Sequence, residues 1–174
     1  MDQELVINAT LSSVAEVFGM MIGLAATPGE SYIQATAPAE AEGVVTLIGL
    51  AGSWIGAGSL SCSLQLACKL SSALLLEEIT SINNDVLDAM AEITNMVFGN
   101  VKTALEAKVG PLGLSIPTVV FGRNFSTNSA GQQIWNVIPY QVESEKMDVK
   151  ICLAPNKRES NNGHAALQFR TRLR

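Results

Sequence analysis

The chain has 174 residues, of which 48% are hydrophobic and 16% are charged, and its net charge at neutral pH is −5. This length and composition suit one compact domain with a buried core, and they exclude an intrinsically disordered chain. The acidic balance argues against nucleic acid as the main partner, although it leaves a protein partner open. The sequence starts with MDQEL, which is acidic where a secretory signal would be basic, so we expect a cytoplasmic protein.

The first part of the chain predicts a helix followed by a short strand. Apolar residues recur at helical spacing from Leu5 to about Leu24, and Thr27-Pro28-Gly29 ends this pattern. We expect a short strand from Ser31 to Ala37 and a turn from Pro38 to Glu42. Each of these boundaries rests on local composition alone.

The longest uncharged run, Gly43 to Cys68, is long enough to span a membrane. It is rich in glycine and serine, however, and it lacks flanking basic clusters. We interpret it as an antiparallel pair of strands, Gly43 to Leu50 and Ile55 to Ser63, and we predict no membrane span. A helix from about Leu64 to Leu76 and a linker to Asn84 follow.

The stretch from Asn84 to Lys108 predicts the longest helix. One side of this helix is apolar, and its members are Val86, Leu87, Met90, Ile93, Val97, Phe98, Val101, Ala104 and Leu105. The opposite side forms a polar stripe of Asp88, Glu92, Asn95, Gly99 and Lys102. We expect Asn84 to be the N-cap, with Asp85 placed favourably in the first turn.

Gly99 is unusual in the middle of such a helix, where it costs about 1 kcal/mol relative to alanine. A missing side chain indicates that another molecule or segment approaches the polar stripe there. The alternative is that the charged residues only keep the helix soluble and that Gly99 makes room for a neighbouring loop of the same chain.

The remainder of the chain predicts mainly β-structure. After breaks between Val109 and Gly113, we expect a strand from Pro117 to Phe121, a polar loop from Gly122 to Gly131, and a hairpin of strands Ile134 to Val142 and Met147 to Leu153. Strands that flank two long helices favour an α+β fold over a doubly wound α/β fold. We assign residues 1–155 to one domain and residues 156–174 to a basic polar C-terminal tail.

Few residues in this chain are suited to bind a metal. It has three cysteines, Cys62, Cys68 and Cys152, none of them in a C-x-x-C pair, and its single histidine, His164, lies in the tail. We therefore expect no metal site and predict that the cysteines are buried, reduced thiols.

The spacing of Asp88, Glu92, Asn95 and Pro117 resembles the signature of the CheC/CheX family, which dephosphorylates phosphorylated CheY in bacterial chemotaxis. The segment EITNMVFGNVK, residues 92–102, is similar to the family's central helix almost throughout. The resemblance implies an α+β fold of two pseudo-symmetric halves, with long helices packed on an antiparallel sheet.

A weak internal repeat agrees with this resemblance, because residues 16–23 align with residues 92–99. Glutamate, methionine and a final glycine coincide, whereas Gly19 stands where Asn95 stands in the second copy. The chain therefore resembles the CheX-type members, which keep only the second motif. Glu16 is interpreted as a solvated or structural residue.

The resemblance also implies roles for the stripe. Glu92 would pair with a lysine of a phosphorylated receiver domain of the CheY type, and Asn95 would orient the water that attacks its phospho-aspartate. Asp88, Gly99 and Lys102 would contact the partner. The protein would hold no cofactor, since Mg²⁺ comes with the receiver, and a homodimer formed through sheet edges is expected.

Two alternatives to a phosphatase stay open. One is a non-catalytic module that binds a receiver or resembles the flagellar switch proteins, which reuse the same fold. The other is a small-molecule sensor that uses the glycine-rich region from Gly49 to Gly58.

Overall fold

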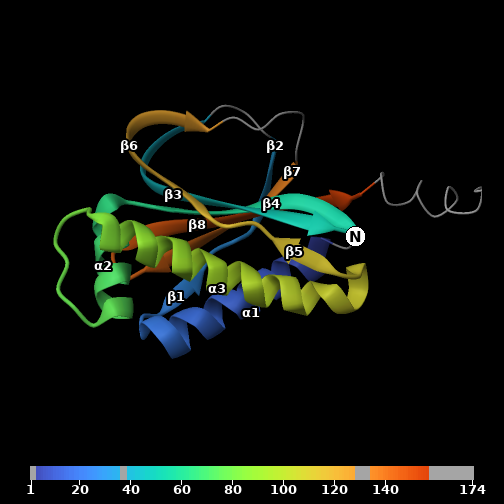
Figure 1. The fold of residues 1–174 in the computed structure, drawn as a ribbon, viewed down its shortest axis with the longest axis horizontal. Helices are drawn as coiled ribbons and strands as arrows, with labels where there is room; N and C mark the ends of the chain where they lie inside the picture. The colour runs from blue at the N-terminus through green and yellow to red at the C-terminus, as the bar shows by residue number, and fades with distance from the viewer. Residues whose placement is uncertain (1–2, 36–38, 128–133, 157–174) are drawn as a thin grey trace, which may run out of the picture.

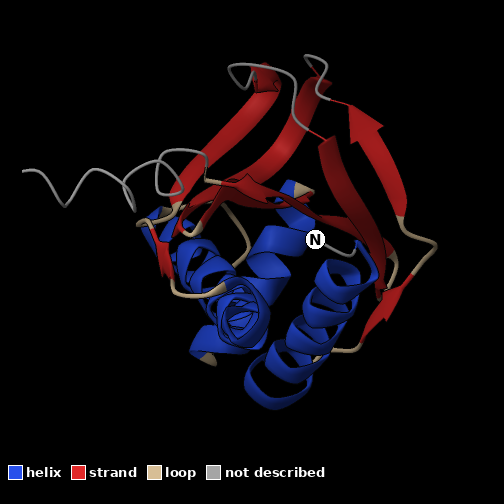
Figure 2. Cartoon of the chain, turned by 90° about the vertical axis from the view of Figure 1, so that its right-hand side faces the viewer, coloured by secondary structure: helices blue, strands red, loops and turns tan. Residues whose placement is uncertain are grey.

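An eight-stranded antiparallel sheet with three α-helices against one face makes up the computed structural model, which describes residues 3–35, 39–127 and 134–156 (Figures 1 and 2). The elements in chain order are α1 (Gln3–Val17), the π-helix η1 (Phe18–Ile22), β1 (Ala26–Pro28), β2 (Tyr32–Ala35), β3 (Ala39–Gly52), β4 (Trp54–Cys62), α2 (Leu64–Leu75), α3 (Asn84–Val109), β5 (Leu112–Leu114), β6 (Thr118–Thr127), β7 (Ile134–Val142) and β8 (Glu145–Pro155). This arrangement confirms the predicted α+β class.

The sheet runs in the order β1-β7-β8-β4-β3-β5, with β2 also paired to β7 and β6 also paired to β3. The long uncharged run forms the β3–β4 hairpin followed by the start of α2, which confirms the prediction of two strands. Every pairing is antiparallel. At one end of the sheet β1 and β2 both pair with β7, and at the other end β5 and β6 both pair with β3.

Several predicted boundaries were wrong, and long-range strand pairing explains them. The expected turn from Pro38 to Glu42 is strand from Ala39 onward, because β3 pairs there with β6. For the same reason β6 continues to Thr127 through much of the segment predicted as a polar loop, whose remainder lies outside the described residues. The short strand β5 was predicted as a break, yet it pairs with the end of β3.

The first helix changes character before it ends. It is α-helical to Val17 and then forms the five-residue π-helix η1, which Gly23 terminates with a φ of 72°. Thr27 and Pro28, which were predicted only to end the helix, are part of β1, and β1 pairs with the end of β7. The predicted end at about Leu24 was therefore close, but the π-turn was not anticipated.

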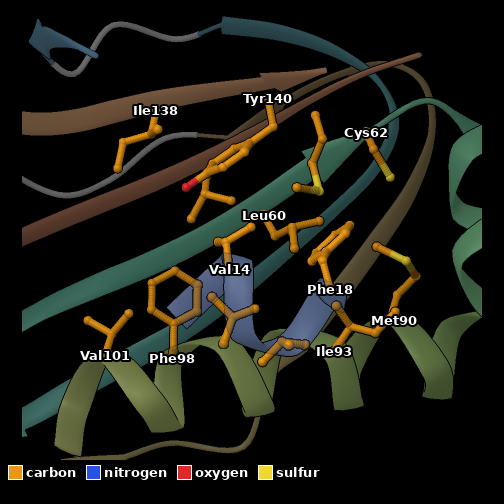
Figure 3. Packing of buried hydrophobic residues seen from close by; sticks show 14 of the residues in the cluster. Val14, Phe18, Leu60, Cys62, Met90, Ile93, Phe98, Val101, Ile138 and Tyr140 are labelled. Atoms are coloured by element: carbon orange, nitrogen blue, oxygen red, sulfur yellow. The ribbon is translucent and has the colours of Figure 1, made fainter. Parts of the chain in front are cut away.

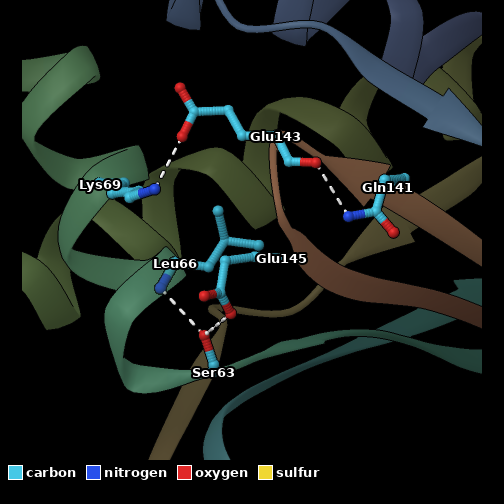
Figure 4. A network of polar contacts seen from close by, with 6 residues as sticks. All are labelled: Ser63, Leu66, Lys69, Gln141, Glu143 and Glu145. Carbon is cyan, nitrogen blue, oxygen red and sulfur yellow. Dashed lines mark hydrogen bonds and ion pairs between the residues drawn. The ribbon is translucent and has the colours of Figure 1, made fainter.

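The turn between β7 and β8 is held to α2 by a polar network (Figure 4). Ser63 Oγ caps α2 by accepting the backbone N–H of Leu66 at 3.0 Å, and it donates to Glu145 Oε2 at 2.7 Å. The ammonium group of Lys69 lies 2.7 Å from Glu143 Oε2. These contacts fix one end of the central hairpin against the helical layer.

The core lies between the sheet and the helices, and Figure 3 shows part of it. Phe18 of η1, Val14 of α1, and Met90, Ile93 and Phe98 of α3 all contribute to this core. The segment Gln3–Ile22 is the one described helix long and apolar enough to cross a membrane, and a core helix passes the same test. Its buried apolar residues, among them Val14 and Phe18, belong to this core.

Most of the predicted basic tail, including His164, lies outside the described residues, so the division of the chain at residue 155 is not tested. Asn156 is described: its side-chain amide donates to the Gly52 carbonyl at 2.9 Å, and its backbone N–H donates to the Ser53 carbonyl at 3.0 Å. The start of the predicted tail is thus attached to the β3–β4 turn.

Candidate phosphatase site

Helix α3 carries the candidate site, and both its ends are capped. Asn83, not Asn84, is the N-cap: its backbone is extended and its Oδ1 accepts the backbone N–H of Val86 at 2.9 Å. The prediction was wrong by one residue because only Asn83 has the extended backbone that brings its side chain to the free N–H groups of the first turn. At the other end, Gly110 has a φ of 81°.

The predicted apolar side of α3 is confirmed with one exception. The buried members are Val86, Met90, Ile93, Val97, Phe98, Val101 and Leu105, and Leu87 is half-buried. Ala104 is exposed, contrary to the prediction. The buried arc near the end of the helix runs through Val101, Leu105 and Val109 in steps of four residues, which leaves Ala104 beyond its edge.

The polar stripe lies on the outer face of the helix. Asp88, Glu92 and Asn95 are exposed on successive turns. Among the described residues, these three side chains have no hydrogen-bond or ion-pair partner. The structure therefore places a carboxylate and a carboxamide three residues apart on a helix whose opposite side is anchored in the core, with both groups open to a partner.

Gly99 is half-buried, and a Cβ atom built on it would meet nothing within 4 Å. No described loop of the chain occupies the space above it, so the alternative that Gly99 makes room for a neighbouring loop has no support there. Its carbonyl accepts the Thr103 hydroxyl at 3.0 Å.

Lys102, the last member of the stripe, is half-buried and engaged within the chain. Its Nζ lies 3.1 Å from Glu106 Oε1, which also accepts the backbone N–H of Leu112 at 3.0 Å. The Leu112 N–H, and secondarily Lys102, lower the pKa of Glu106. Lys102 thus helps to brace the α3–β5 connection, and its contact with a partner stays a prediction.

The first copy of the repeat lies beside the second, and the two are not equivalent. Helices α1 and α3 run side by side in opposite directions, and Asn100 Nδ2 donates to Glu16 Oε2 at 3.3 Å (Figures 1 and 2). Where α3 continues as a regular helix through Asn95, the chain after Glu16 changes into η1 and exposes Gly19. The Glu16–Asn100 contact was not predicted; the only sequence signal was that Asn100 falls inside the segment that resembles the family.

The cysteines offer no additional chemistry. Cys62, Cys68 and Cys152 are buried thiols outside any disulfide, as predicted. Burial, with Glu145 and Cys68 as lesser causes, raises the pKa of the Cys62 thiol to about 12. Within the described ranges, no group of three or more His, Cys, Asp or Glu side chains could hold a metal ion.

The sheet is covered on one face by paired antiparallel helices, and the second helix of the pair, α3, carries a Glu-x-x-Asn sequence on its outer face. This combination defines a protein of the CheC/CheX class. The family model described as "Chemotaxis phosphatase CheX" matches residues 44–141, which is more than half of the chain. The chain belongs to this family.

Individual relatives agree with this assignment. The protein named CheY-P phosphatase CheX from Thermotoga maritima is 29% identical over 146 residues, which cover 81% of this chain and 90% of that protein. The crystal structure of a chemotaxis protein CheX from Desulfovibrio desulfuricans matches with a TM-score of 0.78 and 24% identity, covering 86% of this chain and 99% of the other. CheX in the CheX-CheY-BeF3-Mg²⁺ complex from Borrelia burgdorferi matches with a TM-score of 0.74 and 22% identity, covering 85% and 97%.

Proposed function

We propose that this protein is a cytoplasmic phosphatase that hydrolyses the phospho-aspartate of a CheY-class receiver domain and so terminates a chemotaxis signal. The observation that carries the proposal is the exposed pair Glu92 and Asn95 on the outer face of α3, which has no partner among the described residues, in a chain of the CheX family. A named CheY-P phosphatase among its relatives supports the same reaction.

Asn95 orients the nucleophile in this proposal. Its side-chain carbonyl accepts a hydrogen bond from water while its amide donates to the phosphoryl group or to the receiver. The water oxygen attacks phosphorus, the bond between phosphorus and the aspartate oxygen breaks, and the products are inorganic phosphate and a free carboxylate, with one proton released. Phosphoryl transfer requires mainly alignment and charge stabilisation, so a fixed carboxamide is sufficient for this role.

Glu92 docks the receiver. Its carboxylate is exposed one helical turn from Asn95, so a lysine beside the receiver's phosphorylation site could pair with it while Asn95 enters the pocket. Asp88, one turn earlier, adds negative charge on the same face. Gly99, one turn later, leaves space for the receiver surface.

The chemistry requires no cofactor bound to this chain. The divalent metal that neutralises the phosphoryl oxygens belongs to the receiver in this proposal. The complex from Borrelia burgdorferi, which contains Mg²⁺ together with CheX and CheY, supports this view. The metal is therefore part of the substrate complex.

The test is release of phosphate from a phosphorylated CheY-class receiver of the same organism, with Asn95→Ala compared with the parent. Stimulated hydrolysis should fall on the order of 100-fold or more, whereas the exposed position should leave stability within about 0.5 kcal/mol. Asn8→Ala, which alters an exposed asparagine on α1, is the matched control and should retain full activity. Full activity in Asn95→Ala would reject the proposed mechanism.

The same experiment addresses the non-catalytic alternative. A parent protein that binds the phosphorylated receiver without accelerating phosphate release would be an interaction module. A protein that neither binds nor hydrolyses would belong to neither class, and the small-molecule sensor would then be the remaining hypothesis.

A further inference from the structure

Two methionines project from the π-helix η1 into solvent. Met20 is 79% exposed and Met21 is 55% exposed, although both follow a helix that buries its apolar residues in the core. Exposed large apolar side chains that adjoin one another on a surface often mark an interaction site. Methionine is common at such sites because its flexible, polarisable side chain adapts to the surface of a partner.

The exposure of these residues results from the π-turn. In the second copy of the repeat, the equivalent residues of α3 are Met96, which is half-buried, and Val97, which is fully buried. The extra residue per turn in η1 rotates Met20 and Met21 outward, while Phe18 and Ile22 stay in the core. Short π-helical turns are rare and are found frequently at functional sites.

From the Glu16–Asn100 contact, the chain that leads to Met20 runs in the same direction as the path back along α3 from Asn100 toward Asn95. Helices α1 and α3 are antiparallel (Figure 1), and an exposed hydrogen bond from Asn100 to Glu16 joins them. One turn beyond Glu16 is Met20, and one turn before Asn100 is Met96, next to Asn95. On the buried side, Phe18 of η1 and Ile93 and Met90 of α3 belong to the same core (Figure 3).

We infer that Met20 and Met21 form an apolar docking surface that contacts the receiver domain next to the Glu92–Asn95 site. This inference rests on the proposed function. The occupant follows from continuity, because a receiver placed over Asn95 must also cover the neighbouring turn of the same layer of helices. Glu16, one turn before Met20, and Glu92, one turn before Asn95, are exposed carboxylates on α1 and α3, so this face of the helices suits an apolar patch that is bordered by basic residues.

The experiment measures binding and hydrolysis separately. The probe is a CheY-class receiver from the same organism carrying Mg²⁺ and beryllium fluoride, a mimic of the phosphoryl group. In the double variant Met20→Gln/Met21→Gln, the Kd for this probe should rise on the order of tenfold. The rate of phosphate release at saturating phosphorylated receiver should stay close to that of the parent, because neither residue reaches the reacting atoms.

Three further variants make the result specific. Ile116→Gln removes an apolar side chain that is 89% exposed in the connection between β5 and β6, and it should leave Kd unchanged. The double variant Met20→Leu/Met21→Leu keeps the surface apolar and should retain binding. Asn95→Ala should lose hydrolysis at saturating receiver, which is the result that tests the proposed function itself.

The outcomes separate the two hypotheses. If Asn95→Ala loses hydrolysis but the glutamine variant binds the probe like the parent, the docking surface is rejected and the phosphatase stands. If the glutamine variant changes the oligomeric state of the free protein and leaves Kd unchanged, the surface is an interface between copies of this chain and the inference is also overturned. A folded glutamine variant with a raised Kd, rescued by leucine, supports it.

Discussion

The hydroxyl oxygens of Thr46 on β3 and Thr94 on α3 lie 2.6 Å apart, and both residues are completely buried. Thr94 also lies 2.8 Å from the Met90 carbonyl oxygen, and Thr46 lies 3.2 Å from that of Leu60. Because each hydroxyl has one proton, either Thr46 donates to Thr94 and Thr94 to Met90, or Thr94 donates to Thr46 and Thr46 to Leu60. Both arrangements join the sheet to the turn of α3 that carries Glu92 and Asn95.

Replacing Thr94 with valine should lower the unfolding free energy by about 1 kcal/mol, since the shape is kept and one buried hydrogen bond is lost. Thr46 can still donate to Leu60 in this variant, so no buried hydroxyl is left without a partner. Denaturant unfolding of Thr46→Val, Thr94→Val and the double variant measures the coupling. Losses that simply add would show that the two hydroxyls do not stabilise each other.

Replacing Glu92 with lysine or alanine should weaken receiver binding more than Glu16→Ala. Glu92 has no partner within the described chain, whereas Glu16 already accepts a hydrogen bond from Asn100. The charge reversal at Glu92 should be the more severe of the two changes, because it would oppose a lysine on the receiver. Parallel titrations with the phosphorylated receiver decide this. Equal losses at Glu16 and Glu92 would mean that both copies of the motif bind receivers.

Two substitutions of Gly99 should have different effects on stability and on activity. The open space above it and its helical backbone mean that Gly99→Ala should stabilise the isolated protein by up to about 1 kcal/mol and keep much of the activity. Gly99→Leu should fold normally but lose most hydrolysis, because its side chain would obstruct a receiver that must reach Asn95 one turn away. Melting curves and phosphate release on both variants are the measurement. Full activity in Gly99→Leu would show that this face never meets a partner.

Because the thiol of Cys62 is buried, we expect the folded protein to lose stability at alkaline pH. Its pKa of about 12 in the folded protein exceeds the ordinary value of 9.0, so between these limits the unfolded chain ionises while the folded protein stays protonated. Stability should therefore fall as pH rises above 9, and the loss due to Cys62 between about pH 8 and about pH 10 should be on the order of 1 kcal/mol. Urea unfolding of Cys62→Ala should show a smaller decrease over this range than the parent. An identical decrease in both proteins would contradict the assignment.

The long helix and its two faces could be predicted from the sequence. The spacing of apolar residues from Val86 to Leu105 sets which side is buried, and the polar residues between them then define the exposed stripe. The bounds of β7 were also predicted correctly, because its alternating pattern is local. The resemblance of residues 92–102 to a known family added the chemistry that periodicity does not contain.

The tertiary structure decided which of these residues have partners. The Thr46–Thr94 and Glu16–Asn100 contacts join residues on different elements, and the pairing of β3 with β6 extends both strands into segments whose local composition favours turns. The outward rotation of Met20 and Met21 depends on a π-turn that no pattern in the sequence predicted. Helical periodicity is a local property that neighbouring residues encode, whereas these contacts depend on how segments far apart in the chain pack against one another.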